Sequence, residues 1–413
     1  MHDGSRRGGC PTKGDVSDVS TTADTALSRR AAIVGIGQTE FSRGAGRSVN
    51  QLAAEAAVAA IADAGIDATD VDGTVTFSGD GTDDLQLIRN IGAAELRWTS
   101  RTRGGGGGSC AVIQHAASAV ASGAANYVVV YRSLTQATDR SHRPGQTRPP
   151  GGGPGRGAAQ GYRGPYAPFG LQVPAHIYSL WFQRYMYRFG LTNEDFGRYS
   201  VVARRHAATN PAAYFYGRPI TIEDHQSSRW IVEPILRLLD CCQTNDGAVA
   251  LIVTTPERAA DLPGKAVLVE ATSQSHLRDG DELHDYYLGD RTEFAEATSL
   301  GKRLYEAAGL TPDDIDTAMI YENFSPLVFL QLEAFGFCGV GEARDFIVDG
   351  NIDLTGKLPV NTNGGLLGEA YIHGVNLVLE AVRQVRGTAA NQVPDVEHAM
   401  VCSGRSALIL GSP

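Results

Sequence analysis

The stretch Leu358–Gly374 reads LPVNTNGGLLGEAYIHG and carries a loop rich in asparagine and glycine followed by Tyr371 and His373. The segment VNLVLEAVRQVRG directly after it predicts a helix. Apolar runs in Thr317–Pro326 (TAMIYENFSP) and His398–Ser412 (HAMVCSGRSALILGS) predict strands on either side. Together with the run AVLVEAT that begins at Ala266, they indicate that the C-terminal part of the chain alternates strands with helices.

The N-terminal part shows the same order of elements. The run AAIVGIG (Ala31–Gly37) is continuously apolar and ends in glycine, which is typical of a strand buried on both faces. Ser48–Gln51 forms a capping pattern for an Ala-rich, closely packed helix that Gly65 ends. The residues expected to share one face of this helix are Ala54, Val58, Ile61 and Ala62. The later elements of this half are a helix at Cys110–Gly123 and strands at Tyr127–Tyr131 and Gly247–Thr255.

Two halves with the same order of elements suggest an internal duplication of an α/β fold. We expect an N-terminal domain over 30–262 and a C-terminal domain over 263–413, preceded by a disordered extension over 1–29. Within the first domain, the Gly/Pro-rich segment 140–172 predicts a loop insertion, and 173–235 predicts a helical region. The aromatic residues of that helical region are interpreted as core residues, namely Tyr178, Trp181, Phe182, Tyr185 and Tyr187.

Composition narrows the class of protein. The chain has 413 residues, 42% of them hydrophobic, a formal charge of -10 and a pI near 5.5. This acidic balance argues against binding to nucleic-acid phosphates, and no apolar run is long enough to cross a membrane. We therefore expect a cytoplasmic globular protein. Its six cysteines lack the paired spacing of a zinc site, so we expect no metal on this chain.

Several of these stretches, read together, resemble one family. They are the opening strand and helix, VASGAANYVVVYRS (Val120–Ser133), QTNDGAVALIV (Gln243–Val253) and LPVNTNGG with its continuation LLGEAYIHG. They look like the thiolase superfamily, in particular the sterol carrier protein-type thiolases and their lipid-transfer relatives, over about residues 30–413. The resemblance implies the thiolase fold, in which duplicated βαβαβαββ halves form a layered α/β/α/β/α arrangement.

The thiolase nucleophile is missing. In that family a cysteine at a helix N-terminus attacks the thioester, because the helix end lowers the pKa of the thiol. Counting back from Gly123 places this position at about Gly106, within RGGGGGSCA. Cys110 lies one helical turn further on, and it remains an alternative as a displaced nucleophile. A conventional thiolase or acyl transferase using Cys110 or Cys402 therefore stays open.

The other catalytic motifs of the family are also altered. The register from Asn361 places Tyr371 where the family has a histidine, and His373 lies two residues beyond it in what we expect to be an extended segment. The segment YENF places Tyr321 at the lead position of a second motif, with Asn323 replacing a cysteine found in one branch. The family's Cys-x-Gly motif is matched by CSG, which is Cys402–Gly404.

Without a nucleophile, acyl transfer through a covalent intermediate is closed. The glycine amides at Gly106 and Gly404, together with Asn323, could still hold the oxygen of an enolate. Aldol cleavage of a β-hydroxyacyl-CoA needs this site and two proton transfers, for which Tyr321 and Tyr371 are the catalytic candidates. Which of the two is the acid and which the base stays open. The supporting candidates are Glu322, Glu369, His373 and Cys402.

The motifs GEAYIHG and YENF resemble one branch most, the retro-aldolases that shorten steroid side chains. This resemblance implies cleavage of a 17-hydroxysteroid-22-oyl-CoA to a 17-ketosteroid and propionyl-CoA, with the CoA thioester as substrate. It also implies a small OB-fold and zinc-ribbon partner that carries the only zinc, and a homodimer within a heterotetramer. The alternative from another class is a non-catalytic acyl-CoA or lipid binding protein.

Overall fold

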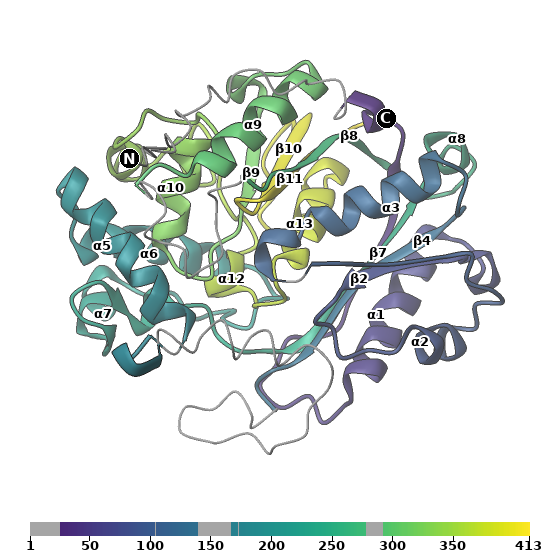
Figure 1. Cartoon of the computed structure of the whole chain (residues 1–413), viewed down its shortest axis with the longest axis horizontal. Coiled ribbons are helices and arrows are strands. Elements are labelled where there is room, and N and C mark those ends of the chain that lie inside the picture. The colour runs from purple at the N-terminus through teal and green to yellow at the C-terminus, as the bar shows by residue number, and fades with distance from the viewer. Residues whose placement is uncertain (1–24, 104, 139–166, 172, 278–291) are drawn as a thin grey trace, which may run out of the picture.

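Nine strands form one sheet in the computed structural model, which describes residues 25–103, 105–138, 167–171, 173–277 and 292–413 (Figure 1). The strands are β1 (Ala32–Gln38), β2 (Gly73–Phe77), β3 (Trp98–Thr102), β4 (Val128–Thr135), β7 (Asp246–Thr254), β8 (Val267–Gln274), β9 (Thr317–Ile320), β10 (His398–Cys402) and β11 (Ser406–Gly411). Their order is β3-β2-β4-β7-β1-β8-β11-β10-β9. A separate hairpin pairs β5 (Trp230–Val232) with β6 (Leu236–Arg237).

This strand order contains a duplication. In the first half β1 pairs antiparallel with β7, β7 antiparallel with β4, and β4 parallel with β2. In the second half β8, β11, β10 and β9 repeat the same sequence of pairings and directions. The halves meet where β1 and β8 pair at two positions, so the sheet is continuous across the two halves. The duplicated α/β fold expected from the sequence is present, with β3 as an additional strand in the first half.

The helices are α1 (Val49–Ala64), α2 (Asp84–Ile91), α3 (Ala111–Ala121), α5 (Pro174–Phe189), α6 (Asn193–Thr209), α7 (Ile222–Ser227), α8 (Pro256–Ala259), α9 (Ala295–Ala308), α10 (Pro326–Ala334), α11 (Ala343–Val348), α12 (Gly365–Gly368) and α13 (Val375–Arg386). Helix α3 contacts β2 and β4 of its own half and β8 of the other, and α13 contacts β9 and β10 as well as β1 and β7. These two helices therefore lie between the halves, at the centre of Figure 1. Helix α1 covers the first half and α9 packs on β8 and β11 of the second, so helical layers alternate with the sheet.

Helix α1 packs on a different face from the one expected. Ser48 caps it by accepting the Gln51 N–H, and Gly65 ends it with a positive φ of 67°. The buried residues of the helix are Leu52, Ala53, Ala56, Ala57, Ala60, Ile61 and Ala64, whereas Val58 is 49% exposed. The reason lies in β1, because a Cβ on Gly35 or Gly37 would come within 2.2 Å of a carbonyl oxygen of the helix. Small residues must therefore face the strand, and alanine fits this close approach.

The region 173–235 is helical as expected, but only some of its aromatic residues are buried. Phe182 and Tyr185 are fully buried, whereas Tyr187 is 91% exposed, so the interpretation of Tyr187 as core was wrong. Tyr178 and Trp181 line a cavity described below. Residues 1–24 of the extension expected over 1–29, and most of the insertion 140–172, lie outside the described residues. Among the described helices, none combines the length and apolar character needed to span a membrane.

Candidate active site

Tyr321 and Tyr371 meet in the structure. Tyr321 follows the last residue of β9, and its N–H donates to the Cys402 carbonyl at 2.8 Å. Tyr371 follows the short helix α12, and its N–H donates to Asn245 Oδ1 at 3.0 Å. The two phenol oxygens lie 3.0 Å apart, so the hydroxyls are hydrogen-bonded to each other. Residues fifty positions apart thus form one pair.

The segment 241–245 holds the two tyrosine loops in register. Cys242 N–H donates to the Asn323 carbonyl at 3.0 Å, and the main chain of Cys241 forms an antiparallel β-bridge with that of Phe324. Three residues later, Thr244 forms a parallel bridge with Tyr371. Both cysteines of this segment are free thiols, which leaves the adjacent pair with a backbone role between the loops.

Gly106 lies directly against the tip of the Tyr321 ring. A Cβ built on Gly106 would lie 1.7 Å from Tyr321 Cζ and 2.0 Å from its hydroxyl oxygen. Gly106 also opens the short turn Gly106–Gly108 that leads into α3, where the first N–H groups have no acceptor within the helix. The phenol therefore fills the space that a side chain at position 106 would need, beside amides suited to a thioester oxygen.

Burial sets the protonation of the pair. Desolvation raises the pKa of Tyr321 well above its ordinary value, and the Tyr371 hydroxyl raises it further. Desolvation and the neighbouring Cys242 also raise the pKa of Tyr371, while its hydrogen bond with Tyr321 and the nearby Arg132 charge act in the opposite direction. Both phenols are therefore neutral at physiological pH, and Tyr371 is the one whose surroundings better tolerate negative charge.

His373 reaches the pair from the side of Tyr371. Their ring centroids lie 5.0 Å apart in an edge-to-face contact. His373 has a φ of 51°, so the extended segment expected from the sequence is wrong here, and the turn brings the ring back to Tyr371. Arg132 donates to His373 Nδ1 from Nε at 3.1 Å and Nη2 at 2.9 Å, which places the imidazole proton on Nε2. Arg132 is itself paired with Asp80 at 2.6 Å, fully inside the protein.

A cavity of about 400 Å³ opens onto the tyrosine pair and Gly106. One part of its lining is apolar and comes from α5 and α10, with Ile177, Trp181 and Leu327. Asn323 also lines it. Gly404 has a φ of 80° in the turn between β10 and β11, and a Cβ there would come within 2.5 Å of Phe294, which lines the cavity. Gly404 itself is not among the described residues that line the cavity, and it lies next to the lining residue Phe294.

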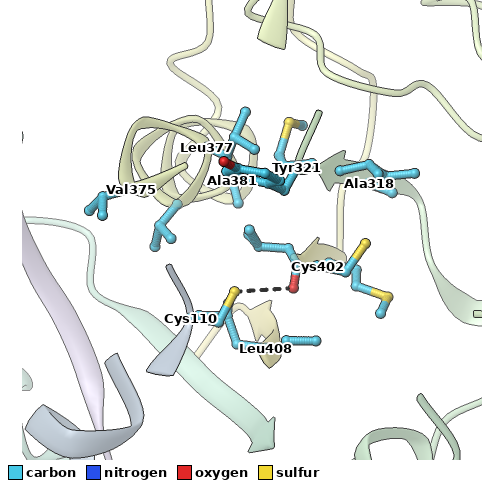
Figure 2. Packing of buried hydrophobic residues seen from close by; sticks show 14 of the residues in the cluster. Cys110, Ala318, Tyr321, Val375, Leu377, Ala381, Cys402 and Leu408 are labelled. Carbon is cyan, nitrogen blue, oxygen red and sulfur yellow. Dashed lines mark hydrogen bonds between the residues drawn. The ribbon is translucent and has the colours of Figure 1, made fainter. Parts of the chain in front are cut away.

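The two cysteines considered as nucleophiles lie away from this cavity. Cys110 is fully buried and its thiol donates to the Val401 carbonyl at 3.4 Å, the dashed contact in Figure 2. Burial raises the pKa of the Cys110 thiol to about 12. Cys402 is also fully buried, and desolvation raises the pKa of its thiol well above the ordinary value. Neither is a thiolate at neutral pH, so neither has the property that a thiolase nucleophile needs.

Glu322 holds the segment that precedes Tyr371. Its Oε1 accepts the Leu366 N–H at 2.6 Å and the Leu367 N–H at 3.4 Å, which anchors the start of α12 ahead of Tyr371. A Cβ on Gly365 would lie 1.9 Å from that oxygen, so glycine is required there. Burial raises the pKa of Glu322 from 4.5 to about 8. The carboxyl is therefore largely protonated at neutral pH and holds the loop rather than reaching the substrate.

Glu322→Gln is expected to stabilise the protein at alkaline pH. Between about pH 4.5 and 8 the unfolded chain releases this proton and the folded chain keeps it, so the free energy of unfolding falls as pH rises. Glutamine keeps the acceptor for Leu366 and removes the titration. The melting temperature of the variant should exceed that of the wild type by several degrees at pH 8 and match it near pH 5. A difference that does not change with pH would contradict the assignment.

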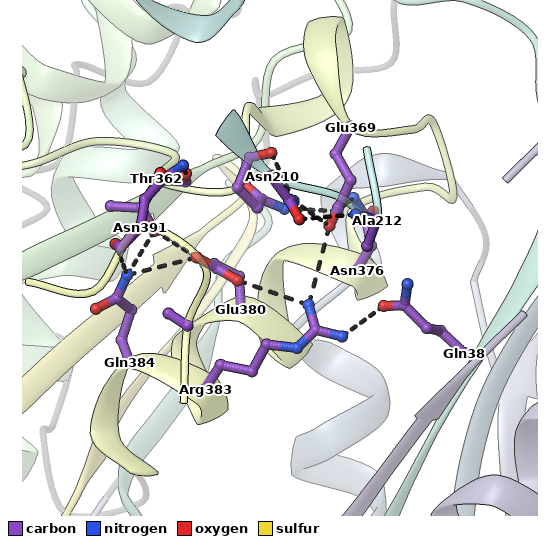
Figure 3. A network of polar contacts seen from close by, with 12 residues as sticks. Gln38, Asn210, Ala212, Thr362, Glu369, Asn376, Glu380, Arg383, Gln384 and Asn391 are labelled. Atoms are coloured by element: carbon purple, nitrogen blue, oxygen red, sulfur yellow. Dashed lines mark hydrogen bonds and ion pairs between the residues drawn. The ribbon is translucent and has the colours of Figure 1, made fainter. Parts of the chain in front are cut away.

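Glu369 belongs to a buried network of amides (Figure 3). Its Oε2 accepts Asn363 Nδ2 at 2.6 Å and Asn376 Nδ2 at 2.8 Å, and Arg383 Nη1 lies 3.9 Å from Oε1. Burial raises the pKa of Glu369 to about 7. Because Glu369 and Asn376 flank the turn that carries Tyr371, this network fixes the turn and does not line the cavity.

Sequence reasoning missed Arg132 and Gln331. Arg132 had a detectable signal, since it directly follows the apolar run YVVVY and precedes a serine, and a charge on a buried strand requires a partner. Gln331 lies on α10, which is buried from Pro326 to Glu333, so a polar residue there was equally informative. Gln331 Nε2 donates to the Tyr321 carbonyl at 2.7 Å and so helps to place the tyrosine.

Known proteins share this architecture. A family model described as thiolase C-terminal domain-like matches residues 282–408. A steroid side-chain-cleaving aldolase from Thermomonospora curvata is 50% identical over 390 residues, 92% of this chain and 98% of the relative. A 17-hydroxy-3-oxo-4-pregnene-20-carboxyl-CoA lyase from Mycobacterium tuberculosis is 49% identical over 93% of this chain and 100% of its own length.

A solved structure agrees with these relatives. The Ltp2-ChsH2(DUF35) aldolase matches with a TM-score of 0.86 at 49% identity, over 94% of this chain and 99% of that chain. This likeness confirms the expected thiolase fold. Because about half of its residues are identical to those of these relatives over nearly its whole length, the chain belongs to the thiolase superfamily, within its group of steroid side-chain-cleaving aldolases.

Proposed function

We propose that this chain cleaves a β-hydroxyacyl-CoA by a retro-aldol reaction in which Tyr321 and Tyr371 move the proton. The observation that carries the proposal is the 3.0 Å contact between the two phenols at Gly106, where a thiolase would place its nucleophile. A phenol pair can transfer protons but cannot hold an acyl group as readily as a thiolate.

The reaction neither takes up nor releases a proton overall. The hydroxyl on the β-carbon loses its proton, the Cα–Cβ bond breaks, and its electron pair passes to the thioester as an enolate. The β-carbon becomes a ketone, and the enolate is protonated at the α-carbon. One proton therefore moves from the β-oxygen to the α-carbon, and two hydrogen-bonded phenols can pass it along while both begin and end neutral.

The surroundings favour one direction for this transfer. Tyr371 has the Arg132 charge nearby, which lowers its pKa relative to an equally buried phenol, so we assign it the proton from the β-hydroxyl. Tyr321 has its tip at Gly106, where the thioester carbon would lie, so we assign it the delivery to the α-carbon. We assign the stabilisation of the enolate oxygen to the amide of Gly106, which lies against the Tyr321 ring, and Gly404 lies in the turn next to Phe294.

The substrate class follows from the relatives and suits the cavity. The relatives act on steroid side chains and on a 17-hydroxylated steroid acyl-CoA, according to their names. The apolar residues of α5 and α10 offer a wall for a hydrocarbon of that kind. We therefore propose a 17-hydroxysteroid-22-oyl-CoA as substrate, with a 17-ketosteroid and propionyl-CoA as products.

The proposal is tested by supplying this thioester and measuring both products by mass spectrometry. We expect equimolar 17-ketosteroid and propionyl-CoA, with kcat within about threefold of the wild type in Cys110→Ala and in Cys402→Ala, since both thiols are buried and protonated. Loss of turnover in a folded cysteine variant would support the acyl transferase instead. Binding of the thioester without any product would support the non-catalytic lipid or acyl-CoA binding protein.

We also propose that the chain works in a complex. The solved relative is named as an aldolase of Ltp2 with ChsH2(DUF35), and by analogy we infer a small OB-fold and zinc-ribbon partner that carries the zinc, around a homodimer of this chain in the cytoplasm. Co-expression with such a partner should give one species on size-exclusion chromatography, with a mass that fits two copies of each. Separate elution of the two proteins at micromolar concentration would reject the complex.

A further inference from the structure

Arg132 is a buried cation that reaches the tyrosine pair through a single histidine. Its side chain is 4% exposed, and Nη1 donates at 2.6 Å to Oδ2 of Asp80, whose carboxylate is fully buried. Nε and Nη2 both donate to His373 Nδ1, at 3.1 Å and 2.9 Å. A buried ion pair contributes little net stability, because desolvation offsets the attraction between the charges. Stability alone therefore does not explain why this cation is buried here.

The neighbours of the guanidinium fix its orientation. Asp80 is anchored in turn, because its Oδ1 accepts the Thr82 N–H at 2.9 Å. Arg132 Cζ lies 5.2 Å from the centroid of the Phe77 ring, which also meets the His373 ring edge-to-face at 6.3 Å. Donors of one rigid plane are thus engaged with two partners, and the guanidinium cannot turn without breaking these hydrogen bonds. Arg132 therefore sets the direction of His373 Nδ1.

His373 adopts a backbone conformation that residues with a side chain rarely use. Its φ is 51°, and Gly374 follows with a φ of 80°. Glycine would occupy position 373 with less strain, so the histidine points to a role for its ring. Strained residues persist where the surrounding structure holds them, and they cluster at active sites. The ring here supplies both an acceptor for Arg132 and a contact with Tyr371.

Tyr371 is held at both ends by other groups. Its N–H donates to Asn245 Oδ1, and its hydroxyl is bonded to that of Tyr321, each at 3.0 Å. Between these two points the phenol ring meets the imidazole of His373, with centroids 5.0 Å apart and planes at 79°. Aromatic rings favour this edge-to-face arrangement. A shift of the imidazole would therefore shift the Tyr371 ring, and with it the phenol oxygen.

We propose that Asp80, Arg132 and His373 form a positioning chain that holds the Tyr371 hydroxyl against Tyr321 for the proton transfer. This inference rests on the proposed aldol cleavage. It adds that the reaction requires the fork geometry of Arg132 as well as its charge. Because the three residues are not among the described residues that line the cavity, they act through Tyr371 and not on the substrate.

Two conservative variants separate geometry from charge. Arg132→Lys keeps the positive charge but replaces the planar fork by one ammonium group. His373→Asn keeps an acceptor for Arg132 and tolerates the positive φ, but it removes the ring. The assay uses the full chain with its co-expressed partner and the 17-hydroxysteroid-22-oyl-CoA. Each variant is expected to lower kcat by about 10- to 100-fold and to leave KM within about twofold of the wild type.

Arg237→Lys is the matched control. The Arg237 guanidinium also lies over an aromatic ring, 3.7 Å from the Trp230 centroid, and its Nε donates to Asn193 Oδ1 at 3.1 Å. None of these three is among the described residues that line the cavity. The same exchange of fork for ammonium should therefore leave kcat within about twofold of the wild type.

A double-mutant cycle distinguishes positioning from a general structural role. In a Tyr371→Phe background there is no hydroxyl to hold, so Arg132→Lys should lower kcat by less than about twofold further. The same loss in both backgrounds would assign Arg132 to general stability and overturn the proposal. Full activity of Arg132→Lys would show that the charge suffices, and full activity of His373→Asn would show that the ring is dispensable. Either result would also reject the positioning chain.

Crystal structures of the wild type and of the variants give a readout that does not depend on turnover. The phenol oxygens of Tyr321 and Tyr371, 3.0 Å apart, should separate beyond about 3.5 Å in Arg132→Lys and His373→Asn but not in Arg237→Lys. If the wild type cleaves no thioester, the proposed function fails, and this separation still supports the chain. If the thioester is cleaved and both variants keep kcat and the phenol contact, the function stands and the positioning chain is rejected.

Discussion

Tyr371→Phe and Tyr321→Phe are each expected to lower kcat for aldol cleavage by roughly 10²- to 10⁴-fold, the range that proton transfer by a positioned group contributes. Phenylalanine keeps the ring and removes only the hydroxyl, so the cavity and KM should change little. The hydrogen bond of 3.0 Å between the phenols makes the pair one unit. The double variant is therefore expected to lose little more than either single variant.

Tyr305→Phe is the matched control for this substitution. Tyr305 is also buried, but its hydroxyl donates to the Phe335 carbonyl at 3.0 Å, away from the tyrosine pair. It should retain kcat within about twofold, because it removes a neutral hydrogen bond that affects stability alone. If Tyr305→Phe lost activity as strongly as the other two variants, general loss of folding would explain the results.

The two tyrosines can also be told apart. In D2O, the α-hydrogens of propionyl-CoA exchange only if a proton is removed from the α-carbon. We assign that contact to Tyr321, which passes its own proton through Tyr371 to a solvent base as it accepts one. Exchange should therefore fall further in Tyr321→Phe than in Tyr371→Phe. Because both phenols begin and end neutral, kcat should be nearly constant from about pH 6 to 9. A tenfold rise per pH unit across that range would instead indicate a phenolate as the base.

The sequence allowed the fold to be predicted because its strongest signals are local. Runs such as AAIVGIG and the capped helix at Ser48 report their own secondary structure, and β1 and α1 lie within two residues of the expected bounds. The predicted packing face of α1 was wrong because the packing depends on Gly35 and Gly37 of β1. In a helix with so many alanines the faces differ little in hydrophobicity, so the sequence does not indicate which face is buried.

The site was predictable only where motif register fixed a position. Tyr321, Tyr371 and Gly106 were placed by counting from conspicuous glycines and asparagines, and the structure brings all three together. The positive φ of His373 and the link from Arg132 to its ring arise from contacts between residues 241 positions apart. Neither local propensity nor spacing contains such information, so these contacts required the folded chain.

Gly106→Ala is expected to reduce kcat by about 10²-fold or more, although it adds one methyl group. The added Cβ would lie 1.7 Å from Tyr321 Cζ, so the ring must move. Its main chain cannot follow, since it is held by the Cys402 carbonyl on one side and Gln331 on the other. A displacement of about 1 Å at a reacting group is enough for such a loss.

The neighbouring Gly107→Ala variant controls for crowding of the glycine turn. There a Cβ would meet only the flexible Arg405 side chain, at 3.3 Å, so a far smaller loss is expected. A double-mutant cycle gives the sharper result, because in a Tyr321→Ala background the ring is absent and Gly106→Ala should cost almost nothing further. Equal costs in both backgrounds would show that the methyl group acts on something other than the ring.

The same geometry predicts that Gly106→Cys does not restore a thiolase. The sulfur would extend from a Cβ position already occupied by the phenol, so the thiol and the Tyr321 ring exclude each other. Loss of the nucleophile and gain of the tyrosine are thus one structural exchange: only a glycine at 106 leaves room for a phenol at the thioester carbon. Acyl transfer from acetoacetyl-CoA should appear, if at all, only when Gly106→Cys is combined with a small residue at 321. Transfer by Gly106→Cys alone would contradict this exclusion.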